Sequence, residues 1–396
     1  MFYFIWIVTG VLSTVFCYPS PDYNIHGTTE HGWEFVRDIF LANFREQQDL
    51  GAAVAVYYQG RSVVNLTGGW FDEAHSKPYD ENTLQLVFST TKGIVAMAAA
   101  ICVQQGLLDY SALVTKYWPE YGQNGKENTT VADILSHRSG LPDVSSPIEQ
   151  YKNWTAMIHI LEKQRPAWVP GTAHGYHSVT YGWLVGELVR RVDPKKRTFG
   201  QFLQDELVTR TETEFYIGLP PYLQYRVSPV VPHVGVRSTL NESMINYFNI
   251  WNDSTIHQAE IPAAIGFTNA WSIARLYATF IGNIKDKSGQ ELVNDEILKY
   301  AIKSNTPSNE MDLVLPYNSS FSMGFHRFGH ALPVFGPDVF GHHGAGGSIG
   351  FAAPSKNLTF AYVMNRIATD TAPIIDPRLK LMLNQIAIKI NDDDDV

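Results

Sequence analysis

The chain has 396 residues, of which 45% are hydrophobic and 17% are charged, and its formal net charge is −9. This composition is typical of a globular protein with one large domain or two intertwined ones. The acidic balance and the lack of a basic stripe argue against nucleic-acid binding, and the sequence shows no internal repeat.

The first 17 residues form an apolar segment that ends at a polar stretch beginning with Tyr18. The segment is shorter than the roughly 20 residues that a membrane-spanning helix needs. Val15 and Cys17 are small enough for the −3 and −1 positions of a signal cleavage site, although no Lys or Arg precedes the run. We therefore predict that residues 1–17 are a cleaved signal peptide of a secreted or lumenal protein. An uncleaved anchor in a single-pass membrane protein is the alternative.

Seven asparagines begin Asn-x-Ser/Thr sequons without an intervening proline: Asn65, Asn128, Asn153, Asn241, Asn252, Asn318 and Asn357. This exceeds the chance expectation and favours a lumenal route with N-glycosylation. The chain has two cysteines, Cys17 and Cys102. Cleavage after Cys17 would remove any intramolecular disulfide, and Cys102, in an apolar run, is expected to be a small buried residue.

The N-terminal part of the chain predicts a helix, a hairpin and a second helix. Apolar residues recur at helical spacing over 31–50, which predicts an amphipathic helix. Two β-rich runs, 52–58 and 63–66, flank a glycine-containing turn and predict a hairpin. The alanine-rich run from about 90 to 106 predicts a buried helix, because alanine is the best helix former.

The remaining chain changes from helical to strand-like patterns. Residues from about 107 to 315 predict mainly helices, and the irregular segment 219–265 is expected to be disordered or to cover a substrate site. Four strand patterns follow: 321–328, 339–343, 348–352 and 358–364. A last helix is predicted over about 376–390. The acidic tail over 392–396 is expected to be solvated and disordered.

Strands at both chain ends predict an α+β fold. We expect a single domain over 22–391, with its sheet built from about 22–100 and 320–391. A mostly helical insertion over about 101–319 would lie between them in sequence. The site is expected between the sheet and the insertion.

Ser89 and Lys92 stand at the start of the second predicted helix, three residues apart, so their side chains share one helix face. A hydroxyl beside an amine at the positive end of a helix is one way to make a nucleophile. The pattern Ser-x-x-Lys is expected about once by chance in a chain of this size. A serine at a helix start is usually only a cap, so the assignment depends on the surrounding motifs.

Three motifs occur in a fixed order: Ser89-Thr90-Thr91-Lys92, Tyr176-x-Ser178 and His342-x-Gly344. This arrangement resembles the serine β-lactamase and penicillin-binding-protein superfamily, and it is most similar to the esterase and class C-like branch. The stretches 135–142 and 344–351 are also similar to that branch. The likeness extends from about residue 30 to 388.

The resemblance implies an antiparallel sheet flanked by helices, as in β-lactamases and transpeptidases, and an acyl-transfer site. Ser89 would attack a substrate carbonyl and form an acyl-enzyme. Lys92 would act as a base because desolvation favours its neutral form. Tyr176 would take or return the proton as a phenolate. The backbone N–H groups of Ser89 and Ala345 would form the oxyanion hole. Three further residues would contact the substrate: Ser178, His342 and Gly344.

Two motifs depart from the usual family pattern. The second ends in Ser178 instead of Asn, and the third begins with His342 instead of Lys. A lysine there would hold a substrate carboxylate, whereas histidine is mostly neutral at pH 7. We therefore favour an exported hydrolase of an ester or amide that needs no carboxylate. Peptidase, transpeptidase-like or β-lactamase activity on the same site is an alternative, and so is a non-catalytic binding or self-assembling protein.

Other catalytic patterns are excluded. Residues 346–350 match the Gly-x-Ser-x-Gly nucleophile elbow, but a strand pattern follows and no histidine occurs after His343, so an α/β-hydrolase is ruled out. The histidines form no His-Glu-x-x-His pattern, and we expect neither a metal nor a cofactor. The expected partner is a small-molecule or peptide acyl substrate, with a membrane only if the N-terminal segment is uncleaved. The sequence does not define the oligomeric state.

Overall fold

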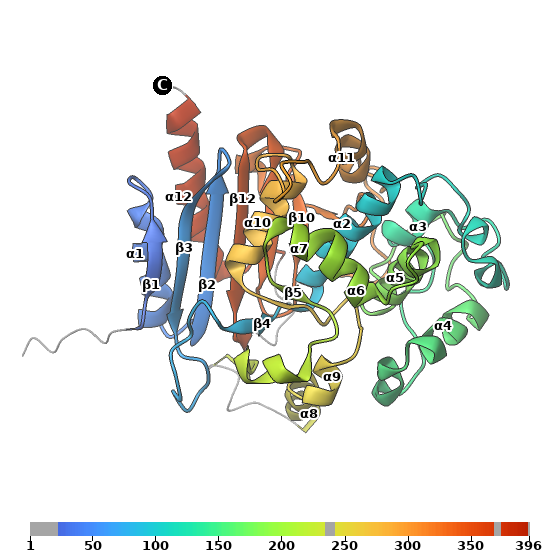
Figure 1. Ribbon diagram of the computed structural model, residues 1–396, viewed down its shortest axis with the longest axis horizontal. Coiled ribbons are helices and arrows are strands. Elements are labelled where there is room, and N and C mark those ends of the chain that lie inside the picture. The colour runs from blue at the N-terminus through green and yellow to red at the C-terminus, as the bar shows by residue number, and fades with distance from the viewer. Residues whose placement is uncertain (1–22, 234–241, 368–373, 395–396) are drawn as a thin grey trace, which may run out of the picture.

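The computed structural model describes residues 23–233, 242–367 and 374–394. Its centre is a seven-stranded antiparallel sheet in the order β1-β3-β2-β12-β11-β10-β9. Three strands come from the N-terminal part: β1 (His26–Thr29), β2 (Gly51–Tyr58) and β3 (Arg61–Gly69). Four come from the C-terminal part: β9 (His326–Arg327), β10 (Phe340–His343), β11 (Ile349–Ala353) and β12 (Leu358–Met364). Figure 1 shows the blue and red strands side by side, as the sequence predicts.

The two chain ends meet where β2 pairs with β12, over seven residue pairs from Tyr58–Leu358 to Ala52–Met364. Every residue of both strands is buried, because helices cover both faces of the sheet. Alternate residues of β2 enter different cores: Val54 lies in one apolar cluster and Ala55 in the other.

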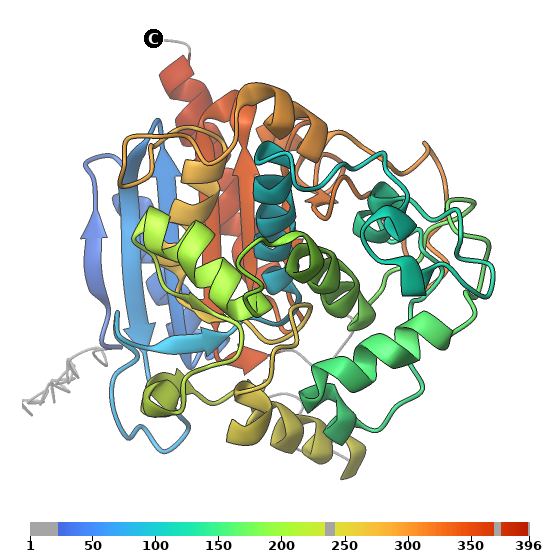
Figure 2. The same ribbon diagram turned by 45° about the vertical axis from the view of Figure 1, so that its right-hand side comes forward.

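Two layers of helices provide these cores: α1 (Glu34–Arg45) and α12 (Pro377–Asp394) on one face, and α2 (Thr91–Gln104) and α10 (Ala270–Phe280) on the other. α2 packs against α5 (Thr180–Val192) on its far side. Figure 2 shows α2 in teal beside the sheet, with α5, in green, to its right. All residues of α2 from Thr91 to Cys102 are buried, including Lys92.

Among the described residues, the helical region also holds shorter helices: α3 (Val131–Leu135), α4 (Trp154–Lys163), α6 (Phe199–Leu203), α7 (Thr209–Thr211), α8 (Glu242–Trp251), α9 (Ser254–His257) and α11 (Asp295–Ile302). A small second sheet has four strands: β5 (Phe215–Tyr216), β8 (Phe267–Thr268), β4 (Leu84–Leu86) and β6 (Val227–Ser228). A third pairing joins β7 (Val231–Pro232) to β13 (Arg366–Ile367).

Several predicted elements need correction. The segment 219–265 is not a continuous irregular loop, because it holds α8 and α9, whose Phe248 and Ile256 are buried in the core. The strand predicted over 321–328 shortens to β9. The acidic tail is helical as far as Asp394, because α12 continues through it, although Asp392 and Asp393 are exposed as expected. The first helix ends at Arg45 rather than near residue 50.

The predicted export features are only partly within the described residues. The proposed leader 1–17 and the sequon at Asn241 lie outside them. Five sequon asparagines are exposed: Asn128, Asn153, Asn252, Asn318 and Asn357. Asn65 is half-buried in β3, which is paired on both sides. Among the described helices, none is long and apolar enough to cross a membrane.

Candidate active site

Ser89 lies in a 3-10 turn, η1 (Phe88–Thr90), that leads into α2. Within residues 83–102, all of which the structure describes, Ser89 alone is not buried. The chain therefore presents a single hydroxyl at the surface of an otherwise enclosed helix start. This placement agrees with the position predicted for a nucleophile.

Phe88, directly before Ser89, has a backbone φ of 45°. Bulky residues rarely adopt this left-handed conformation, so the surrounding packing must hold it. The Phe88 ring stacks on Tyr247 at 6.3 Å and meets Trp251 edge-on at 5.6 Å between ring centroids. Two aromatic residues of α8 thus hold the turn that carries Ser89.

Lys92 is fully buried and its Nζ makes three hydrogen bonds. Its partners are the Ser89 Oγ at 3.0 Å, the Ser178 carbonyl at 2.7 Å and the Ala263 carbonyl at 2.8 Å. Burial holds the pKa of Lys92 well below its usual range. A neutral amine has two N–H donors and one lone pair, so it can donate to both carbonyls and accept the proton of Ser89.

Tyr176 stands against both groups. Lys92 Nζ lies 4.8 Å from the centroid of its ring. Burial raises the pKa of Tyr176, and a hydrogen bond with the Ser89 hydroxyl opposes this shift. The neutral phenol is therefore favoured over the phenolate that the resemblance implies. Lys92 remains as the group whose Nζ lies within hydrogen-bond distance of the Ser89 hydroxyl.

The turn between β10 and β11 packs directly on the Ser89 turn. A Cβ at Gly344 would overlap the Val87 carbonyl oxygen and approach Thr90 Oγ1 to 3.0 Å, so only glycine fits this approach. Ala345 follows on the exposed side of the turn. Its N–H donates to no acceptor among the described residues. The two predicted oxyanion donors, Ser89 and Ala345, thus belong to turns that touch.

His342 lies buried beside this site, with its ring centroid 6.0 Å from that of Tyr176. Its Nδ1 donates to the His343 carbonyl at 2.8 Å, which leaves Nε2 as an acceptor. Burial and the neighbouring Lys92 hold the pKa of His342 well below its usual range. The third motif therefore supplies a neutral ring and not a fixed cation.

Ser178 and Ala263 bind the Lys92 amine through their backbone carbonyls and not through their side chains. The sequence points to Ser178 only as a substrate contact, and its side chain is exposed. Ala263 carries no recognisable pattern at all, because every residue has a carbonyl. Only the fold brings both oxygens to one amine.

The loop after α3 holds residues 174–178, the Tyr176 segment, through hydrogen bonds. His137 accepts the His177 N–H at its Nδ1 at 3.0 Å and the Gly175 N–H at its carbonyl at 3.1 Å. His177 Nε2 in turn accepts from the Ser139 hydroxyl and the Leu141 N–H, both at 2.9 Å. The family-like stretch 135–142 therefore positions the loop that carries Tyr176 and Ser178.

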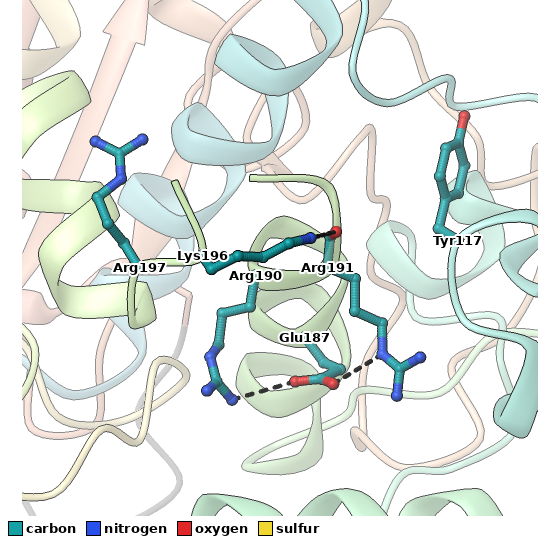
Figure 3. Close-up of a pocket in the computed structure, with 6 residues that line it drawn as sticks. All are labelled: Tyr117, Glu187, Arg190, Arg191, Lys196 and Arg197. Atoms are coloured by element: carbon teal, nitrogen blue, oxygen red, sulfur yellow. Dashed lines mark hydrogen bonds and ion pairs between the residues drawn. The ribbon is translucent and has the colours of Figure 1, made fainter. Parts of the chain in front are cut away.

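An open cavity of about 410 Å³ lies elsewhere, at the C-terminal end of α5. It is lined by six residues: Tyr117, Glu187, Arg190, Arg191, Lys196 and Arg197. Figure 3 shows that the three guanidinium groups point in different directions, and that two of them are paired with Glu187. Lys196 Nζ is engaged by the Arg191 carbonyl. These cations do not converge on a common point, so we do not place the active site here. The described residues also hold no cluster of three or more metal-binding side chains.

Comparison with known proteins agrees with this geometry. A family model described as Beta-lactamase matches residues 38–383. The chain belongs to the β-lactamase family. It is 29% identical to the esterase/beta-lactamase LipL of Mycobacterium tuberculosis (strain ATCC 25618 / H37Rv) over 375 residues, which cover 88% of this chain and 85% of LipL.

Two crystal structures place this β-lactamase family member close to esterases and penicillin-binding proteins. A family VIII carboxylesterase superposes with a TM-score of 0.83 at 33% identity, covering 92% of this chain and 99% of that one. A penicillin-binding protein homolog from Caulobacter crescentus gives 0.78 at 33% identity, covering 93% and 98%. The protein is a serine hydrolase of the β-lactamase family, and its relatives are named esterases and β-lactamases. Its α+β fold is that of these relatives.

Proposed function

We propose that the protein hydrolyses an ester or amide through an acyl-enzyme on Ser89. The observation that carries the proposal is the 3.0 Å contact between the Ser89 Oγ and the buried Nζ of Lys92. Lys92 has its two other partners in backbone carbonyls. These carbonyls orient the lone pair of a neutral amine toward the only hydroxyl in the set.

The positions of the groups support the following path for acylation. As Ser89 Oγ attacks the substrate carbonyl, its proton passes to Lys92 Nζ. The developing oxyanion is stabilised by the N–H groups of Ser89 and Ala345, each typically worth about 2.7–4 kcal/mol. The Tyr176 phenol gives its proton to the leaving group and regains one from the Lys92 ammonium. The alcohol or amine departs neutral, and Lys92 returns to the amine.

Deacylation reverses this proton path with water in place of the leaving group. Lys92 and Tyr176 remove a proton from the attacking water, and the Ser89 Oγ leaves the tetrahedral intermediate with that proton. The carboxylic acid product departs. Ser89 is restored for the next cycle.

The neutral state of His342 supports a substrate without a required carboxylate. A cation in that place would attract a carboxylate, and the buried imidazole offers only an acceptor at Nε2. LipL is named an esterase/beta-lactamase, which makes β-lactam hydrolysis the second candidate. Comparing kcat/KM on short-chain esters, peptides and a chromogenic cephalosporin separates these. A strong preference for peptides or the cephalosporin would contradict the ester assignment.

A fluorophosphonate probe tests the nucleophile directly. We expect the wild-type protein to gain one probe mass and Ser89→Ala to gain none. Ser348→Ala is the control, because Ser348 is the serine of residues 346–350, which match the Gly-x-Ser-x-Gly pattern without forming a nucleophile elbow. It should label like the wild type. Labelling of Ser89→Ala at the wild-type rate would refute the assignment, and a folded wild type that neither labels nor turns over a broad acyl panel would favour a non-catalytic binding protein.

We also propose that the protein is exported and N-glycosylated. The apolar segment 1–17 and the exposed sequons support this. The mature chain should begin at Tyr18, and N-glycosidase should increase its gel mobility. Asn128→Gln should remove one glycan, whereas Asn65→Gln should not, because Asn65 is half-buried in a paired strand. An unglycosylated protein that retains Met1 would contradict export.

A further inference from the structure

A second buried polar network contacts the Tyr176 segment. Its centre is His174, which is fully buried. The His174 Nδ1 lies 2.7 Å from Glu310 Oε1, and its Nε2 lies 3.1 Å from the Ser319 hydroxyl. Arg138 also pairs with Glu310. The network thus links the Tyr176 segment to a loop more than 130 residues further along the chain.

Asp312 connects this network to Tyr176 itself. Its Oδ1 accepts the Tyr176 N–H at 3.2 Å and the N–H groups of Val314 and Leu315, each at 2.8 Å. Its Oδ2 accepts the Ser319 hydroxyl at 2.6 Å. The Asp312 side chain is fully buried. A buried carboxylate therefore holds the backbone of the residue whose phenol faces Ser89.

His174 joins the two carboxylates of the network. Its Nδ1 lies within hydrogen-bond distance of Glu310 Oε1, and its Nε2 lies within hydrogen-bond distance of the Ser319 hydroxyl. Ser319 in turn donates its proton to Asp312.

Such a network is costly to assemble in the interior, because each charged group loses its hydration. Apolar residues would pack the same space with less desolvation. Complete networks of this kind fix one geometry in return, and breaking them leaves an unpaired buried charge. Asp312 is hydrogen-bonded to the backbone of Tyr176, and the proposed proton transfer depends on the position of the Tyr176 phenol.

We propose that His174, Glu310 and Asp312 are positioning residues that set the Tyr176 phenol against Ser89 and Lys92. They touch no reacting atom and act through the backbone of Tyr176. The proposal rests on the proposed function, in which Tyr176 transfers protons. A displacement of about 1 Å at such a group lowers the rate by as much as about 100-fold.

The test is Asp312→Ala measured in two backgrounds, wild type and Tyr176→Phe. In the wild type we expect kcat on a short-chain ester to fall about 10- to 100-fold, with KM changed less than about threefold. In Tyr176→Phe, which has no phenolic hydroxyl to position, the same substitution should change kcat by less than about twofold. Fluorophosphonate titration counts the competent Ser89 sites, so kcat refers to folded enzyme only.

Asp286→Ala is the matched control. Asp286 also accepts two loop N–H groups, those of Ser288 at 2.9 Å and Gln290 at 3.0 Å, and it is buried and paired with Arg210. It lies in the loop after α10, outside the Tyr176 network. Its removal should lower the melting temperature and leave kcat per titrated site unchanged.

Asp312→Asn keeps the test decisive if Asp312→Ala does not fold. Asparagine retains an oxygen for the Tyr176 N–H and loses the acceptor for Ser319, so we expect a smaller fall in kcat that again disappears in Tyr176→Phe. An equal fall in both backgrounds, or full activity of Asp312→Asn and His174→Gln, would overturn the positioning role. Full activity of Tyr176→Phe would also overturn it while leaving Ser89 hydrolysis intact, whereas a fully active Ser89→Ala would refute the proposed function itself.

Discussion

Among the residues that the structure describes, two lysines are fully buried in similar cages of hydrogen-bond partners, and one of the two lies beside a hydroxyl. Lys92 Nζ contacts two carbonyls and Ser89 Oγ. Lys126 Nζ contacts three carbonyls, those of Gln123 at 2.9 Å, Glu162 at 2.9 Å and Gln164 at 2.7 Å. Both side chains have no exposed surface, so burial alone does not distinguish them.

The two cages differ in whether the third hydrogen-bond partner of the lysine can donate a proton. Three carbonyls can only accept, so the cage of Lys126 requires three N–H donors and suits the ammonium ion. A hydroxyl can also donate, so the cage of Lys92 suits the neutral amine. Burial lowers the pKa of both lysines, but the charges of Glu127 and Glu162 raise that of Lys126 and oppose the shift. A buried lysine becomes a candidate base through its neighbours.

The largest expected effect is on turnover by the paired variants Lys92→Met and Lys126→Met. Methionine keeps the length and apolar stem of lysine and removes the amine. Lys92→Met should lower kcat by about 10³- to 10⁶-fold, because the base and nucleophile act as a unit. Lys126→Met should stay within about threefold of wild type per titrated site. Equal losses in the two variants would show that the cages do not differ in role.

Tyr176→Phe should have the next largest effect. Loss of the phenolic proton should lower kcat/KM about 10²- to 10⁴-fold, the usual range for an acid–base group. Adding Lys92→Met should make little further difference, since both groups serve one proton path. The free energy of unfolding should change by at most about 0.5–1.5 kcal/mol, because one hydrogen bond is lost. If Tyr176→Phe retains full kcat/KM while Lys92→Met is inactive, Lys92 works without the phenol.

The pH profile of activity should report the state of Lys92. Only the neutral amine can take the Ser89 proton, so kcat/KM should rise with pH through the folded-state pKa of Lys92, which lies well below 10.5. The measurement is kcat/KM on a neutral ester from acid to alkaline pH. Lys126→Met should retain the wild-type profile. A rate that rises only near pH 10.5 would show that burial does not activate Lys92.

The smallest expected effect concerns stability. Because the pKa of Lys92 is lower in the folded than in the unfolded protein, the unfolded chain binds more protons between the two values. The free energy of unfolding should therefore gain, as pH rises through this window, up to about 1.4 kcal/mol per pH unit from this group. Below the folded-state pKa the penalty is complete and constant. Urea unfolding of Lys92→Met should lack this contribution, and parallel curves for wild type and variant would contradict it.

The side-chain pattern of the sequence predicted the sheet and contained the three motifs. It did not point to the backbone carbonyl of Ala263 or to Asp312. The apolar runs of β2 and β12 and the order of Ser89, Tyr176 and His342 are visible in the residues themselves. The carbonyl of Ala263 is not, because a backbone acceptor leaves no trace in composition. Asp312 was missed because it lies in a loop 136 residues beyond Tyr176, and the pairing is purely tertiary. The raised pKa of Tyr176 could not be read from the sequence either, because the burial that causes it is a property of the fold.

The pairing of β2 with β12 has a consequence for when the protein becomes active. Tyr58 finds its partner Leu358 only 300 residues further along the chain, and contacts of such large sequence separation form late in folding. During synthesis the edge of β2 that pairs with β12 therefore stays open until β12 has emerged. The turn that carries Ala345 arrives in the same final segment. A nascent chain is therefore without a complete catalytic centre, and activity begins when the last strands close the sheet.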